Sequence, residues 1–180
     1  MYRSDGANEH GGVILYTRDN LLCTPCYELN NSGFADCIWC TISIGGNETV
    51  LIGVIYRSLS STLDNNEKLL KMIEQAITIS NSKRLLIMGD FNLPEIDYDV
   101  YDVRGAADSF PCRFFDLTQD LFLVQNVFNF TRVRNGQQPS KLDYVFTLHD
   151  NEVEEMNYLS PIGLSDHVGL IWKLFVCFLF

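Results

Sequence analysis

The stretch RLLIMGDFNLPEID, Arg84–Asp97, decides how the rest of the sequence is interpreted. Its apolar run Leu85–Met88 is typical of a short strand that is covered on both faces. The run breaks at Gly89, and Asp90 and Asn92 follow at once. The stretch therefore predicts a buried strand that ends by presenting a carboxylate and a carboxamide two residues apart.

The composition is that of an ordinary globular protein. The chain has 180 residues, of which 47% are hydrophobic and 20% charged, and we expect one domain over residues 1–180. Its formal net charge of −10 argues against a non-specific nucleic-acid binder, which usually has a basic face. The charge does not exclude an enzyme that acts on phosphate, because a bound divalent metal changes the local field.

Neither end of the sequence predicts membrane targeting. The start, MYRSDGANEHGG, is polar and lacks the apolar core of a signal peptide. The apolar extension at residues 174–180 is far shorter than the roughly 20 residues that a spanning helix needs. We therefore expect an intracellular protein, nuclear or cytoplasmic, with no membrane partner.

Two C-x-x-C pairs raise the alternative of a zinc-ribbon interaction module, at Cys23–Cys26 and Cys37–Cys40. The second pair lies in DCIWCTISI, which alternates as a strand, so Cys37 and Cys40 should point to opposite faces. We expect reduced, buried cysteines and no zinc.

The remaining pattern indicates an α/β protein in which sheet packs on sheet and helices lie outside. GGVILYTR, DCIWCTISI and TVLIGVIYR read as strands, and a helix follows with a capping box predicted at Asp64 and Glu67. A second helix should begin near Pro111, and shorter strands follow around LVQNVF, KLDYVFT, EEMNYLS and HVGLIWKLFV.

Polar side chains gather where four of these predicted strands begin or end. They belong to the stretches VIYR, GDFN, SKLDYV and LSDH, and are Tyr56, Arg57, Asp90, Asn92, Asp143, Ser165, Asp166 and His167. Each alone is explained by a turn, a cap or packing. Together they suit phosphodiester hydrolysis, because carboxylates hold Mg²⁺ and an imidazole paired with a carboxylate can stay charged.

In this order, GDFN, SKLDYV and LSDH resemble the endonuclease/exonuclease/phosphatase superfamily. The sequence is most similar to the apurinic-type endonuclease domain of non-LTR retrotransposons, from about Gly11 to about Lys173. The resemblance implies a DNase I-like fold, a two-sheet β-sandwich flanked by helices. It also implies Mg²⁺-dependent hydrolysis of DNA by a domain associated with a reverse transcriptase.

The resemblance also implies roles for single residues. Asp90 would align or deprotonate the attacking water, and Asn92 would hold water and phosphate. His167 would contact the scissile phosphate, with Asp143 behind it. Other implied roles are metal binding by Asp90, Asn92 and Asp166, contact of Tyr56 with phosphate or leaving group, and substrate binding by Arg57, Thr131, Ser140 and Ser165.

DNA as the ancestral substrate requires a local basic cluster despite the net charge. We expect Arg57, Arg132, Arg134 and Lys141 to form that cluster near His167.

At its start the sequence departs from the family pattern. The family opens with a strand that bears an Asn, followed by a helix and a strand that bears a metal-binding Glu. GGVILYTRDNL, which follows these elements in the family, already begins at Gly11, and the adjacent Asn8 and Glu9 do not replace them. We therefore expect a fold without its first strand-helix-strand elements, weak Mg²⁺ binding with Mn²⁺ as an alternative, and self-association through an exposed sheet edge.

Three interpretations remain open within the superfamily. The first is a Mg²⁺-dependent DNA endonuclease. The second is a catalytically inactive, truncated remnant with weak phosphate or partner binding. The third keeps the fold and changes the substrate to a phosphoinositide, a sphingolipid or a nucleotide conjugate.

Overall fold

The computed structural model describes residues 1–5, 11–45, 48–81 and 84–175. The predictions for Asn8, for Glu9 and for most of the apolar extension concern positions outside these residues. Among the residues described, no helix is both long and apolar enough to cross a membrane. The elements in chain order are β1 Tyr2–Asp5, β2 Gly12–Leu15, β3 Cys23–Pro25, α1 Tyr27–Asn30, β4 Cys37–Gly45, β5 Glu48–Tyr56, α2 Leu63–Ser80, β6 Arg84–Asp90, β7 Ile96–Asp97, β8 Asp102–Val103, α3 Phe110–Asp120, β9 Val124–Gln125, β10 Asp143–Thr147, β11 Val153–Leu159 and β12 Gly169–Leu174.

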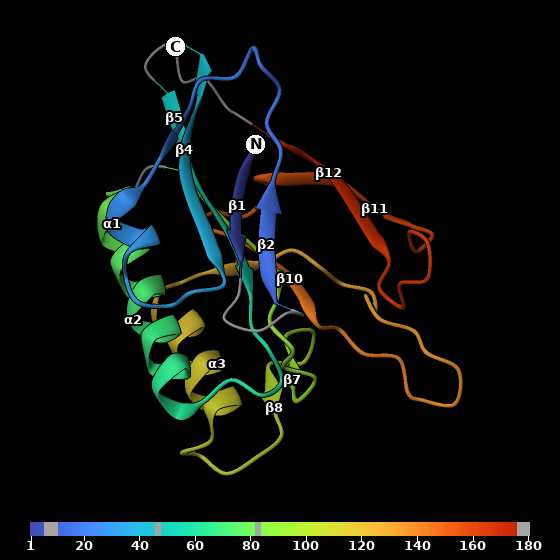
Figure 1. Ribbon diagram of the computed structural model, residues 1–180. Coiled ribbons are helices and arrows are strands. Elements are labelled where there is room, and N and C mark those ends of the chain that lie inside the picture. Colours follow the sequence, from blue (N-terminus) through green and yellow to red (C-terminus); the bar gives the residue numbers. More distant parts are fainter. Residues whose placement is uncertain (6–10, 46–47, 82–83, 176–180) are drawn as a thin grey trace.

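A central sheet of six strands carries the fold, in the order β3-β4-β5-β6-β10-β9 (Figure 1). Only the β5–β6 pair is parallel among the strand pairs of this sheet. A parallel pair needs a long crossover, and α2 supplies it. This confirms the predicted α/β class.

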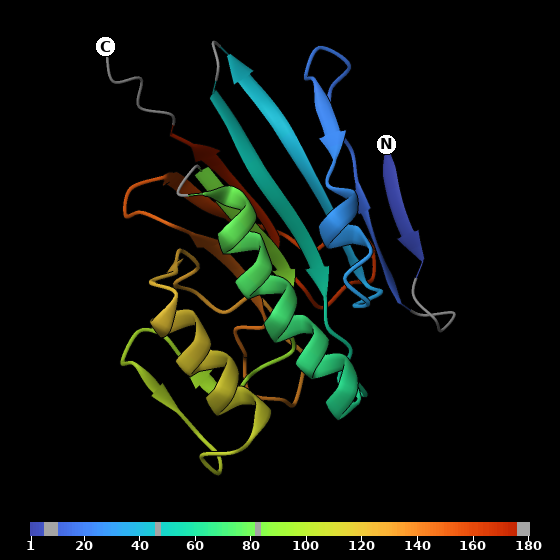
Figure 2. The same ribbon diagram turned by 90° about the vertical axis from the view of Figure 1, so that its left-hand side faces the viewer.

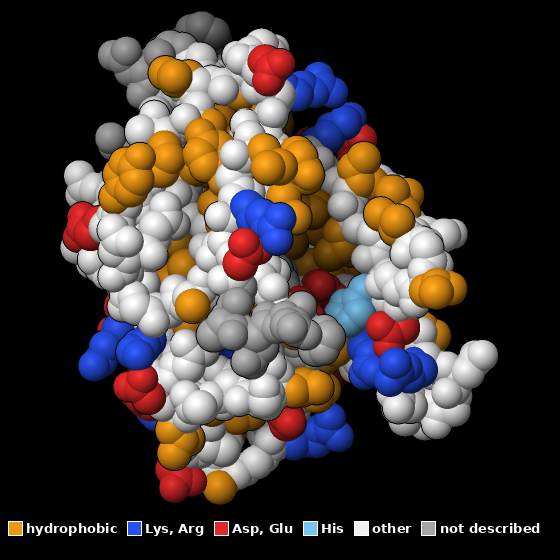
Figure 3. All heavy atoms as spheres, in the orientation of Figure 1, with side chains coloured by type: hydrophobic (Ala, Val, Ile, Leu, Met, Phe, Trp, Pro, Cys, Tyr) orange, Lys and Arg blue, Asp and Glu red, His pale blue; other side chains and the backbone are white. Residues whose placement is uncertain are grey.

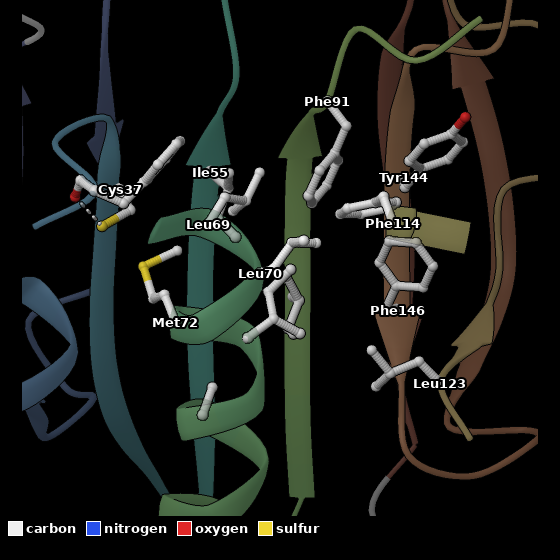
Figure 4. Packing of buried hydrophobic residues seen from close by; sticks show 14 of the residues in the cluster. Cys37, Ile55, Leu69, Leu70, Met72, Phe91, Phe114, Leu123, Tyr144 and Phe146 are labelled. Carbon is white, nitrogen blue, oxygen red and sulfur yellow. Dashed lines mark hydrogen bonds between the residues drawn. The ribbon is translucent and has the colours of Figure 1, made fainter. Parts of the chain in front are cut away.

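The two faces of the central sheet have different covers. Figure 2 shows α2 and α3 lying across one face. Their apolar residues pack there against Trp39, Ile55, Ile87 and Phe146, in the cluster drawn in Figure 4. On the opposite face, β11 and β12 pack against residues such as Ile52 and Val145. We call these the helix face and the site face.

The strand period decides which side chains reach each face. Cys37 packs in the cluster of the helix face, whereas Cys40 packs in that of the site face. The strand prediction for DCIWCTISI is therefore confirmed, and its two thiols point apart. The five cysteines for which the structure gives a state are free.

Helix α2 begins differently from the prediction. Its N-cap is Thr62, whose side chain accepts a hydrogen bond from the Asn65 backbone N–H at 3.2 Å. Asp64 instead pairs with Lys68 one turn further on, and Glu67 with Arg113 of α3. The predicted capping box at Asp64 and Glu67 is thus wrong, because the threonine two residues earlier provides the cap.

Two short antiparallel pairs complete the site face. Within the described residues, β2 pairs only with β1, and β12 pairs only with β11. Each of these pairs therefore has an edge with no strand beside it in that part of the chain. Strand β1 falls in the polar start of the sequence, where the residue pattern predicted no strand.

Candidate active site

Three polar side chains form one row across neighbouring strands of the central sheet. Tyr56 lies beside Asp90 in the β5–β6 register, and Asp143 lies opposite Asp90 in the β6–β10 register. Two residues earlier in β5 and β6, Val54 and Met88 belong to the cluster of the site face. Because side chains alternate along strands, the row continues the site face where its apolar residues end.

The glycine before Asp90 is required by a close backbone approach. Gly89 has φ of +143°, and a Cβ placed there would lie 1.8 Å from the carbonyl oxygen of Ile55 in β5. A side chain at this position would therefore force the β5 and β6 backbones apart. Glycine keeps the two strands in register up to Tyr56 and Asp90.

The carboxamide of Asn92, two residues after Asp90, holds the Asp90 carboxylate. Its backbone N–H donates to Asp90 Oδ1 at 3.1 Å, and its Nδ2 donates to Asp90 Oδ2 at 3.0 Å. The same Nδ2 donates to the Arg57 carbonyl at 2.9 Å. Asn92 adopts a left-handed φ of +51°, a conformation that asparagine tolerates well. Asn92 therefore fixes the orientation of the Asp90 carboxylate.

Asp143 and His167 are joined by a hydrogen bond of 2.8 Å between Oδ2 and Nδ1. Thr131 fixes the Asp143 backbone, because its buried Oγ1 accepts from the N–H groups of Leu142 and Asp143 at 3.0 and 3.1 Å. Ser165 Oγ accepts from the His167 N–H at 3.1 Å. With Nδ1 engaged, Nε2 is the ring nitrogen left for a substrate.

A second set of backbone bonds ties the His167 segment to the rest of the site. The Val133 N–H donates to the Asp166 carbonyl at 2.9 Å, and the Val168 N–H donates to the Thr131 carbonyl at 2.8 Å. Ser140 contributes through its backbone, which exchanges hydrogen bonds with Arg132 at 3.0 Å in each direction. Thr131 and Ser140 thus support the site through these hydrogen bonds.

Burial and neighbouring charges shift two of the site's pKa values. Burial, reinforced by the nearby Asp143, raises the pKa of Asp90 to about 6. The hydrogen bond to Asp143 raises the pKa of His167 above its usual range. The site therefore combines a carboxylate that takes up a proton more readily than usual with an imidazole whose charged form is stabilised by Asp143.

Asp90, Asp143 and His167 can also hold a metal ion. One ligand atom from each lies within 4.8 Å of the others, and in the described residues this is the only such group of His, Cys, Asp or Glu. The Asn92 Nδ2 hydrogens are both donated to protein oxygens, so its Oδ1 can face an ion. Oxygen donors of this kind suit Mg²⁺ or Mn²⁺.

Asp166 stands apart from this group. Arg132 Nε and Arg134 Nε contact its Oδ2 at 2.9 and 3.3 Å. The hydrogen bond from Arg132 lowers the pKa of Asp166, which keeps the carboxylate charged. Figure 3 shows a histidine and acidic side chains in a hollow of this face, with a group of basic side chains at its rim.

Two of the four basic residues expected beside His167 are held by other partners. Arg57 is buried, and its guanidinium donates to Asn66 Oδ1 at 2.8 Å and to the carbonyls of Phe91 and Asn92 at 3.3 Å. Lys141 Nζ lies 3.0 Å from both carboxylate oxygens of Asp99. The expected cluster is therefore reduced to Arg132 and Arg134.

Sequence reasoning missed the residues that position these groups. Asn66, buried in α2, accepts the Arg57 hydrogen bond, and the Tyr158 hydroxyl accepts from the N–H groups of Phe128 and Asn129 at 3.0 and 3.1 Å. The buried face of α2 carries one signal: an asparagine there must find a hydrogen-bond partner. Tyr158 offers no such signal.

A cavity of about 610 Å³ lies beside the site. Its walls include Pro94, which follows Asn92 by two residues, and Lys141, which precedes Asp143 by two. Four of its lining residues are acidic and two, Arg104 and Lys141, are basic, so the net negative charge of the lining disfavours a phosphate group there. Its lining acidic residues are Glu95, Asp97, Asp99 and Asp102.

The fold is shared with solved endonuclease structures. The endonuclease domain of TRAS1, a telomere-specific non-LTR retrotransposon, superposes with a TM-score of 0.66 at 16% identity. That match covers 88% of this chain and 71% of the TRAS1 chain. An endonuclease/exonuclease/phosphatase family protein from Leptotrichia buccalis C-1013-b gives 0.53 at 16% identity, covering 89% of this chain and 63% of its own. The chain thus shares the DNase I-like fold of these two solved structures.

A comparison of the sequence with protein-family models identifies the family of the chain. Residues 50–171 match the endonuclease-reverse transcriptase family, and this segment contains every residue of the proposed site. The chain belongs to that family. Among curated proteins, none matches its sequence.

Proposed function

We propose that the chain is a divalent-metal-dependent endonuclease that hydrolyses phosphodiester bonds of DNA. The grouping of Asp90, Asp143 and His167 within 4.8 Å carries this proposal, because the imidazole could bind a phosphate oxygen while the nearby Asp90 carboxylate acts on the attacking water. Membership of the endonuclease-reverse transcriptase family supports the same reaction class. We extend the proposal to one catalytic domain over residues 1–180.

His167 binds the scissile phosphate in this proposal. Its hydrogen bond to Asp143 favours the imidazolium, which attracts the phosphate oxygens and donates from Nε2. The bond also fixes the ring orientation. The Tyr56 phenol, next to Asp90 in the row, would donate to a phosphate oxygen or to the leaving group.

Asp90 accepts the proton of the attacking water. A pKa of about 6 leaves its carboxylate mostly deprotonated at neutral pH and still basic enough to assist the attack. Asn92 holds the carboxylate in place through two hydrogen bonds.

Asp90 and Asn92 Oδ1 would hold Mg²⁺ or Mn²⁺. Asp166, expected from the sequence as a further ligand, lies outside the group around Asp90 and contacts Arg132 and Arg134. The bound ion would supply positive charge opposite the phosphate oxygens. Both Asp90 oxygens already accept hydrogen bonds from Asn92, so we expect weak metal binding.

DNA is the proposed substrate because cations flank the site. Arg132 and Arg134 both contact the carboxylate of Asp166, the residue directly before His167. Their two positive charges exceed its single negative charge. The surplus charge can bind the DNA backbone next to the scissile phosphate. The acidic cavity beside the site would exclude the backbone and so limit its path.

A supercoiled-plasmid nicking assay tests the proposal. Nicking should require Mg²⁺ or Mn²⁺, stop with EDTA, and fall about 10²- to 10⁴-fold in His167→Ala. His149→Ala is the matched control, because His149 is exposed in the connection between β10 and β11. Absence of metal-dependent nicking, or equal loss in both variants, would contradict the proposal and favour the catalytically inactive remnant.

A further inference from the structure

The loop directly before the site exposes two large apolar side chains. In this loop, residues 161–164, Ile162 is 84% exposed and Leu164 106% exposed. The intervening Gly163 has a left-handed φ of +64°, and the Ser165 N–H donates to the Ile162 carbonyl at 3.2 Å. Single exposed apolar residues are normal on protein surfaces. Two large ones on one tight turn are not, and they form a small exposed apolar cluster.

Chain connectivity keeps the 161–164 loop near His167. Leu164 precedes His167 by three residues, which limits the separation of their Cα atoms to about 11 Å. The hydrogen bonds from Val133 to Asp166 and from Val168 to Thr131 hold the two residues that flank His167. In DNA, where each base pair rises about 3.4 Å, this reach corresponds to about three steps from the scissile phosphate.

Charge next to the loop selects the partner. The side chains of Arg132 and Arg134 are 26% and 57% exposed, and both contact Asp166, which leaves a surplus of positive charge. An apolar tip flanked by arginines matches the way proteins deform duplex DNA, with a wedge between base pairs and cations on the phosphates. An apolar protein partner would have no need of these cations.

We propose that the 161–164 loop inserts Ile162 and Leu164 between base pairs of duplex DNA beside the scissile phosphate. The inference rests on the proposed endonuclease function and adds how the substrate is distorted. Partial unstacking would bend the duplex and expose the backbone to His167. The loop is thereby a binding element that acts before any bond is cleaved.

A binding experiment in EDTA separates this step from cleavage. Duplexes of mixed sequence carry 2-aminopurine, whose fluorescence rises when it unstacks, and a terminal dye for anisotropy. The wild type is compared with the double variant Ile162→Ser/Leu164→Ser and with Leu22→Ser, which removes a leucine that is 72% exposed between β2 and β3. All three should unfold at the same temperature, because the changed side chains are exposed.

The expected result is a rise in 2-aminopurine fluorescence with the wild type and with Leu22→Ser. The double variant should lose that rise and bind about tenfold more weakly or worse. Wild-type distortion and affinity in the double variant, with weaker binding in Arg134→Ala, would overturn the wedge and leave the endonuclease proposal intact. Insertion would also be overturned if the wild type bound DNA without any change in fluorescence, even if the double variant bound more weakly.

Failure of the wild type to bind duplex DNA at all would overturn the wedge and DNA as the substrate together. The same result would favour a protein as the partner of the 161–164 loop.

Discussion

The helix face and the site face of the central sheet are built from the same strands but have different tasks. On the helix face, Tyr144 and Phe146 of β10 pack against Phe91 and Phe114, and all four are at most 1% exposed. On the site face of the same strand, the neighbouring residue Asp143 binds His167. Because alternate residues of a strand point to opposite faces, one strand can contribute to a rigid core on one side and to a reactive site on the other.

The largest expected effect comes from the site face. Asp143→Asn keeps the shape of the side chain but removes the charge that favours the His167 imidazolium. We expect nicking to fall about 10²- to 10⁴-fold. The melting temperature should change little, because both side chains are partly exposed. Plasmid nicking and thermal unfolding of the same preparation measure the two effects.

The helix face should show the reverse pattern. Phe146→Ala removes a ring that packs against Phe91, Tyr98, Phe114 and Tyr144, and we expect about 3–5 kcal/mol of lost stability. Nicking per folded molecule should stay unchanged. Urea unfolding gives the stability, with Phe122→Ala as the control because Phe122 is 83% exposed. A loss of activity greater than the loss of folded protein would mean that the two faces are not separate.

Gly89 couples the two faces, since it sets the approach of β5 and β6. Gly89→Ala should cost about 2–4 kcal/mol, because the methyl group would overlap the Ile55 carbonyl. Gly45→Ala separates this overlap from the cost of the backbone conformation. Gly45 has φ of +115°, and no atom of the described residues lies within 4 Å of a Cβ placed there, so its variant should lose only about 1 kcal/mol. Equal losses in the two variants would show that the close approach is not decisive.

The smallest expected effect is a dependence of stability on pH. Folding raises the pKa of Asp90 from 3.8 to about 6, so the folded state holds this proton more tightly than the unfolded state. The resulting stability is fully present below pH 3.8 and is lost as the pH rises through 6.

Between pH 4 and pH 7.5 we expect Asp90 to lower the free energy of unfolding by on the order of 1–2 kcal/mol. Urea unfolding at both pH values measures this change. In Asp90→Asn the difference between the two pH values should shrink by that amount. An unchanged difference would place the Asp90 pKa near its usual value.

Local patterns predicted much of the fold. The apolar run before GDFN, the alternation of DCIWCTISI and the proline in the first turn of α3 each depend on neighbouring residues alone, and the structure agrees with all three. The start of α2 was missed because Thr62, two residues before Asp64, also suits an N-cap and provides it.

Contacts between distant segments could not be read from the sequence in the same way. The antiparallel register that sets Asp143 opposite Asp90 joins residues far apart along the chain, and no local pattern fixes it. Arg57 shows the same limit, since its burial depends on α2 and on the backbone after Asp90. The resemblance to a family placed these residues in one site, while their partners became visible only in three dimensions.

The central claim is that Asp143 and His167 act as one unit, and a double-mutant cycle tests it most directly. Single-turnover nicking rates would be measured for the wild type, Asp143→Asn, His167→Ala and the variant with both changes. The account predicts that the double variant is no slower than His167→Ala alone, because Asp143 acts through the imidazole. Rate losses that multiply in the double variant would contradict it, since the two residues would then act independently.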